Sequence, residues 1–95
     1  MNQKELEKAI KNNLKDTMNE APYILWIEKT RFFVIGNGTV YLIAKDEWSA
    51  RIISYKSIIE MLYNTAKEVL KKDVTIRCCY YDEDGKIIVI KEDKK

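Results

Sequence analysis

Histidine is missing from this chain, and cysteine occurs only twice, as the adjacent pair Cys78-Cys79. Without histidine the commonest general base of enzymes is absent, and a zinc site has almost no ligands from which it could be built. The carboxylates cluster in turns and at expected helix ends, where contact with solvent is the simplest explanation for them. We therefore expect a protein that is not an enzyme and that holds no metal and no cofactor.

Glycine is scarce as well, and two of the three glycines form the sequence Gly36-Asn37-Gly38. This G-x-G lacks the strand-to-helix setting and the third glycine of a dinucleotide-binding loop. It predicts a tight turn between two strands instead, because glycine adopts positive φ without strain.

Long apolar runs are also lacking. No stretch approaches the roughly 18 apolar residues of a membrane span, and the amino terminus, MNQKELEK, is too polar for a signal peptide. Neighbouring residues of a strand point to opposite faces, so we expect no disulfide between the two cysteines, one of them buried and the other partly exposed. These features predict a cytoplasmic protein that does not bind membranes.

Neither sign of charge is in large excess, because 17 Lys and Arg against 15 Asp and Glu give a net charge of +2. A nucleic-acid-binding domain of this size usually has a stronger basic excess or a clustered basic face. We therefore expect weak or no direct binding to DNA. Nucleic-acid binding stays open as the alternative, because a basic edge could still form from Arg31, Lys45, Arg51 and Lys56.

The length of 95 residues suits one small domain, which we place at residues 1–91, with a charged tail at residues 92–95. An apolar residue at every fourth position predicts an amphipathic helix over about residues 3–19, which Pro22 terminates. The segment YILWI, residues 23–27, predicts a short second helix, so apolar that it should lie between other elements, with Tyr23 and Trp26 in the core.

A third and longest helix is expected to begin after Asp46 and to run to about residue 70. Asp46 is a good N-cap, because its carboxylate can accept hydrogen bonds from the free backbone N–H groups of the first turn. Apolar residues three or four apart define the side of this helix that we expect to face the core: Trp48, Ile52, Tyr55, Ile59, Leu62, Ala66 and Val69.

Four strands complete the pattern, at residues 31–35, 39–44, 74–80 and 87–90. The first two form a hairpin, and the last two form another around the turn at residues 82–85. The sequence therefore predicts an α+β domain in the order α-α-β-β-α-β, with an extra C-terminal strand. This order resembles KH domains, which clamp nucleic acid with a G-x-x-G loop between helices. The junction here reads NEAP, residues 19–22, with no glycine and with an acidic residue, so a KH-type clamp is absent.

Residues 23–78 resemble domain I, the amino-terminal domain of the bacterial replication initiator DnaA. That family has an aromatic residue followed by Trp-Ile, then two short strands around a glycine or asparagine turn, then a segment that opens a long helix and a final strand. The matching pieces in this chain are Tyr23 with Trp26-Ile27, GNGTVYL at residues 36–42, AKDEW at residues 44–48 and VTI at residues 74–76. The resemblance covers somewhat over half of the chain.

The resemblance implies a two-layer, KH-like domain that works as a protein–protein adaptor in the initiation of DNA replication. It implies binding to the replicative helicase, to regulators of initiation or to the initiator itself. The exposed contact residues of the family correspond to Asp46, Trp48 and Ser49 at the start of the long helix and to Pro22 between the first two helices.

Three departures from the family bear on these expectations. Glu7 stands where the family usually has a tryptophan used in self-association, so dimerisation of the family type is not expected. The long helix has one extra residue between Ile53 and Ile58. The family chain continues into a linker and an ATPase domain, whereas an extra strand follows Asp84-Gly85 here. We expect a free-standing relative, with a segment of a longer initiator as the alternative.

Trp48 has two interpretations. A large aromatic residue in the first turn of a helix can cover the end of the hydrophobic core. It can also stay partly exposed as an anchor for a partner, because tryptophan is enriched among the residues that dominate interface energies. The position of Trp48 and the resemblance to the family favour the anchor.

Overall fold

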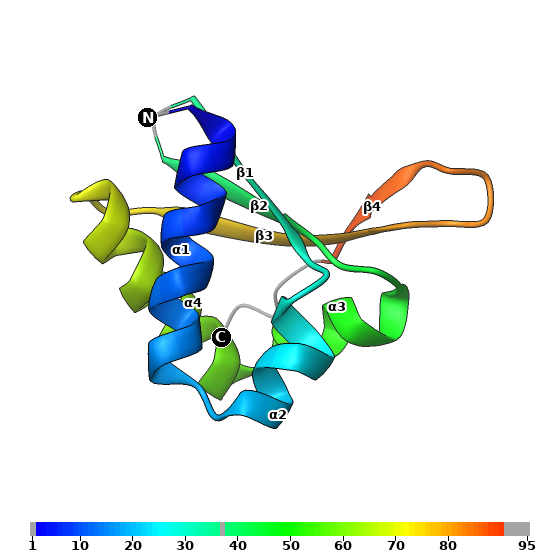
Figure 1. The fold of residues 1–95 in the computed structure, drawn as a ribbon. Coiled ribbons are helices and arrows are strands. Elements are labelled where there is room, and N and C mark those ends of the chain that lie inside the picture. The colour runs from blue at the N-terminus through cyan, green and yellow to red at the C-terminus, as the bar shows by residue number, and fades with distance from the viewer. Residues whose placement is uncertain (1, 37, 91–95) are drawn as a thin grey trace.

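The computed structural model describes residues 2–36 and 38–90, and it has an α+β fold (Figure 1). The expected turn residue Asn37 and the charged tail at residues 92–95 lie outside the described residues. The elements in chain order are α1 (Gln3–Thr17), α2 (Glu20–Pro22), the π-helical turn η1 (Tyr23–Ile27), β1 (Arg31–Ile35), β2 (Thr39–Ile43), α3 (Glu47–Ile53), α4 (Lys56–Leu70), β3 (Thr75–Tyr81) and β4 (Ile87–Val89).

The four strands form one mixed sheet in the order β1-β2-β3-β4. The two predicted hairpins are confirmed, since β1 pairs antiparallel with β2 and β3 pairs antiparallel with β4, while β2 and β3 are parallel. The helices gather on one side of this sheet (Figure 1). Even-numbered strand residues such as Phe32, Val40, Leu42 and Ile76 point to that side and are buried in the core. Within the described part of the chain, no helix has the length and apolarity needed to cross a membrane.

The amphipathic first helix is confirmed, with Ile10 and Leu14 buried against the core. Asn2 caps it and exchanges hydrogen bonds with Glu5 in a capping box. The expected end at Asn19 is wrong by two residues, because the backbone is already extended at Met18. Pro22 does not act as a breaker either, since it lies in the first turn of the next helical segment, where its missing N–H costs nothing.

The segment η1 is only partly enclosed, which corrects the expectation that it lies between other elements. Tyr23 and Ile27 are buried and Trp26 is half-buried against the core, as expected for a core segment. Ile24 and Leu25 are about half exposed, because a helical turn at the edge of the helical layer has one side that no element covers.

The long helix expected over residues 47–70 is two helices, α3 and α4. Tyr55 has extended backbone with ψ 149°, and the Ser54 hydroxyl donates a 2.8 Å hydrogen bond to the Arg51 carbonyl oxygen at the end of α3. The break changes which side of the first half is buried. The buried residues of α3 are Ser49, Ala50 and Ile53, whereas Trp48 and Tyr55 are exposed.

Cys78 and Cys79 are both buried, which corrects the expectation that one is partly exposed. Cys78 points to the helical side of the sheet and belongs to the core. Cys79 points to the other side, but β3 is an inner strand. Its small side chain stands between Ile43 on β2 and Val89 on β4, and these larger side chains shield the thiol from solvent.

Candidate protein-interaction site

The start of α3 is held by Asp46, as the sequence predicts. Asp46 has extended backbone, and its Oδ1 accepts a 2.7 Å hydrogen bond from the Ser49 backbone N–H. This bond holds the pKa of Asp46 below its usual value, so the carboxylate stays charged at neutral pH. The cap fixes the position of the first turn of α3, which carries Trp48.

Ser49 is buried, with 1% of its surface exposed. Its Oγ has no partner with hydrogen-bond geometry among the described residues, yet it lies near enough to the Asp46 carboxylate to contribute to the lower pKa. A partner cannot touch this side chain in the folded domain. Ser49 therefore packs under the N-cap of α3. The resemblance implied that Ser49 is an exposed contact residue, and its burial corrects that expectation.

Trp48 is 67% exposed, more than any other large hydrophobic residue in the described part of the chain. Tyr55, just after α3, is 63% exposed, and η1, which contacts α3, adds the exposed side chains of Ile24 and Leu25. The sequence pattern pointed to Trp48 but missed the other three. The sequence placed Tyr55 on the core-facing side of one long helix. Tyr55 is exposed because it lies in the break between α3 and α4.

Pro22 belongs to a different surface feature. It is half-buried and lines a hollow of about 390 Å³ between α1, η1 and α4, together with Trp26, Ile58 and Met61. Neither Asp46, Trp48 nor Ser49 lines this hollow. The structure thus brings Asp46, Trp48 and Ser49 together at the start of α3 and places Pro22 at a second location, beside the half-buried Trp26.

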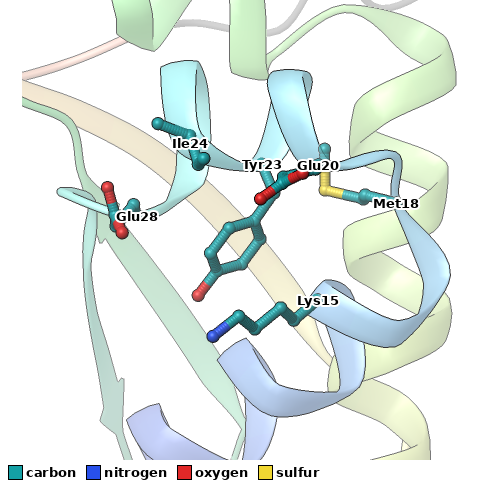
Figure 2. Close-up of a pocket in the computed structure, with 6 residues that line it drawn as sticks. All are labelled: Lys15, Met18, Glu20, Tyr23, Ile24 and Glu28. Atoms are coloured by element: carbon teal, nitrogen blue, oxygen red, sulfur yellow. The ribbon is translucent and has the colours of Figure 1, made fainter.

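A second hollow, of about 430 Å³, also has Met18 in its lining (Figure 2). The Tyr23 hydroxyl and the Lys15 side chain point toward one another there, and Glu20 and Glu28 add two carboxylates. Burial, and then the charge of Glu28, raise the pKa of Tyr23, so the phenol stays protonated. The sequence analysis identified the buried ring of Tyr23 but gave no signal for the hollow, because its residues come from separate helices.

Among residues 2–36 and 38–90, no group of three or more Cys, Asp and Glu side chains could hold a metal ion. Burial raises the pKa of the Cys79 thiol, which disfavours the reactive thiolate. The site offers exposed aromatic and aliphatic surface, of which Trp48 lies on the capped helix α3.

The four residues of the expected basic edge do not act as four unpaired cations. Arg31 lies 2.9 Å from a Glu7 carboxylate oxygen, and Arg51 lies 2.7 Å from a Glu47 carboxylate oxygen. Lys45 and Lys56 are exposed on either side of α3. The paired residues offer a phosphate backbone less attraction than four free cations would.

Glu7 connects α1 to the edge strand β1. Its Oε2 accepts 2.9 Å hydrogen bonds from the Phe32 backbone N–H and from Arg31. Gln3, one turn earlier, exchanges hydrogen bonds with the Val34 backbone in the same way. These side chains satisfy backbone groups that an edge strand leaves unpaired. Position 7 thus faces the sheet, where its carboxylate binds the backbone of β1.

We expect the stability of the domain to depend on the charge of Glu7. Burial raises its pKa, but the hydrogen bonds from Phe32 and Arg31 and the nearby Lys11 outweigh this effect, so the pKa lies below the ordinary 4.5. A lowered pKa means that the carboxylate stabilises the fold above about pH 4.5, and that this contribution is lost as the pH falls through the folded-state pKa. Glu7→Gln should cost about 1–2 kcal/mol at pH 7 and less at pH 3, measured by urea unfolding at both pH values. An equal cost at the two pH values would contradict this role.

Comparisons with known proteins do not identify the chain, because no protein-family model and no curated protein matches it.

Proposed function

We propose that this chain is a non-catalytic protein-interaction module that acts in the initiation of bacterial DNA replication or in its regulation, in the manner of DnaA domain I. The α+β fold, with two helical segments before the first hairpin and helices between that hairpin and β3, is compatible with a KH-like two-layer domain of this kind. The proposed partners are the replicative helicase, regulators of initiation or the initiator itself. A cytoplasmic location belongs to the same proposal.

One observation carries the proposal, namely the exposure of Trp48 at the start of a capped helix. A tryptophan with two thirds of its surface in water gives little to the core, whereas the same side chain can bury a large apolar area against a partner. We assign it the role of anchor. Asp46 and Ser49 hold it in place through the cap, and Pro22 is a second contact at the hollow beside Trp26.

The structure offers no specific observation in favour of the alternative, a KH-like nucleic-acid-binding domain. The junction expected to carry a clamp is the short helix α2, and two of the four basic residues considered are paired with glutamates. We therefore propose weak or no direct DNA binding. Fluorescence anisotropy with single- and double-stranded oligonucleotides tests this, and submicromolar affinity at physiological salt would favour the alternative.

Calorimetric titrations with the purified bacterial replicative helicase and with a full-length initiator test the partners. We expect saturable binding of at least one of them to the wild type and no detectable binding to Trp48→Ala. Ile35→Ala is a matched control, because Ile35 is 56% exposed and lies at the end of β1 and not on α3 or η1. Loss of binding in the control but not in Trp48→Ala would place the contact elsewhere.

A further inference from the structure

The hollow in Figure 2 has no part in the proposed function, because none of the four contact residues assigned to that function lies in its lining. Tyr23, which does line it, is 7% exposed, and its hydroxyl points toward the Lys15 side chain. Among the residues that the structure describes, none hydrogen-bonds to this hydroxyl. Because buried polar groups are almost always hydrogen-bonded, the Tyr23 hydroxyl should bond to whatever fills the hollow, whether water or a ligand.

Two hydrogen-bond donors converge in this hollow. Lys15 projects from α1, and its ammonium group points toward the hydroxyl of Tyr23 on η1 (Figure 2). In the described part of the chain, Lys15 takes part in no ion pair. The phenol of Tyr23 keeps its proton at neutral pH, because burial and then the charge of Glu28 raise its pKa. An ammonium group only donates, so the group that fits between these two side chains is an acceptor, and a carboxylate is the strongest one.

The charges of the lining select against a simple anion. Glu20 and Glu28 contribute two carboxylates against the one ammonium group of Lys15. An anion would therefore meet repulsion from the two glutamates, and a cation would meet repulsion from Lys15. A zwitterion can pair with both signs, because its carboxylate can bind the two donors while its ammonium group binds a glutamate.

The remaining lining is apolar and sets the rest of the ligand. Met18 is half-buried, Ile24 is 48% exposed, and the ring of Tyr23 adds aromatic surface. The volume of about 430 Å³ lies at the small end of the range of about 300–1,000 Å³ that is usual for small-molecule sites. An aliphatic side chain next to a carboxylate and an ammonium group matches this lining. A residue within a polypeptide does not, because its amino and carboxyl groups are uncharged amides.

We propose that this hollow binds a free aliphatic α-amino acid. The carboxylate of the ligand accepts a hydrogen bond from the Tyr23 hydroxyl and pairs with Lys15. Its ammonium group pairs with Glu20 or Glu28, and its side chain lies against the apolar part of the lining. Binding is weak, because the three charged side chains of the lining are all exposed to solvent. The site lies apart from the start of α3, so it does not rest on the proposed function.

Titration of the isotope-labelled protein with L-leucine, followed by two-dimensional NMR, tests the proposal. We expect saturable shifts of the backbone amide signals of Met18, Tyr23 and Ile24, with a Kd on the order of 1 mM. Isocaproate lacks the ammonium group of leucine, isoamylamine lacks the carboxylate, and N-acetyl-leucinamide lacks both charges. Each analogue should bind at least about 5-fold more weakly than leucine. Closer affinity of any analogue would overturn the proposal, since the hollow would then suit an anion, a basic group or a protein segment.

Tyr23→Phe keeps the buried ring, removes only the hydroxyl, and should weaken leucine binding at least about 5-fold. Its matched control is Tyr55→Phe, because Tyr55 is exposed and lies outside the lining. Lys15→Gln, at an exposed position, should weaken binding as well, which keeps the test decisive if Tyr23→Phe does not fold, and Lys8→Gln on the same helix should not. Unchanged affinity in the folded lining variants, or no saturable shift up to about 20 mM leucine, would overturn the proposal.

Discussion

Trp48→Ala should weaken partner binding at least about 30-fold while leaving the domain folded, because truncating a central interface tryptophan commonly costs about 2 kcal/mol or more. The same change should lower the free energy of unfolding by only about 1 kcal/mol or less, since Trp48 is 67% exposed and contributes little buried area. Calorimetric titration measures the first effect, and urea unfolding measures the second.

Trp26→Ala is the control for this prediction, because it changes the chain's other tryptophan. Trp26 is half-buried and packs against the core. Its loss should cost about 3 kcal/mol, as expected for the truncation of a large aromatic residue at the core. Equal and large losses of stability in the two variants would make Trp48 a core residue and would leave the interaction site without its anchor.

Leu14→Ala should cause the largest loss of stability, about 3–4 kcal/mol, out of the total of about 5–15 kcal/mol that is usual for a domain. Leu14 is fully buried where α1 meets the core, and truncation removes its contacts and leaves a cavity. Lys8→Ala, at an exposed position of the same helix, should change stability by no more than about 0.5 kcal/mol. Urea unfolding of the two variants measures the difference. A loss near 1 kcal/mol in Leu14→Ala would mean that α1 is not packed as described.

Local patterns predicted those parts of the fold that depend on neighbours in the chain. The spacing of apolar residues predicted α1, and residue types predicted β1 with both of its ends. A carboxylate before a helical pattern predicted the Asp46 cap. The exposure of Trp48 was one of two interpretations. The sequence favoured an exposed Trp48 because this residue lies in the first turn of a helix, and such a turn lies at the rim of a domain.

Features that depend on how the elements pack could not be predicted from the pattern. The apolar spacing in the sequence continues across Ser54 and Tyr55, although the helix itself is broken there. Periodicity therefore predicted one helix and placed Tyr55 on the side that faces the core. Ser49 is buried because α3 packs through its small residues, which a scale of side-chain polarity cannot show. Glu7 binds the backbone of Phe32, which lies 25 positions later in the chain. Local spacing in the sequence cannot indicate a contact between residues so far apart.

The central claim is that the start of α3 binds a protein of the replication machinery, and affinity capture from a bacterial lysate tests it most directly. Wild type, Trp48→Ala and the control Ile35→Ala would be immobilised at equal density, and bound proteins would be quantified by mass spectrometry. The account predicts that a replicative helicase, an initiation regulator or the initiator is enriched by the wild type and by the control, and is lost with Trp48→Ala. Equal recovery by all three, or recovery of no replication protein by any of them, would contradict it.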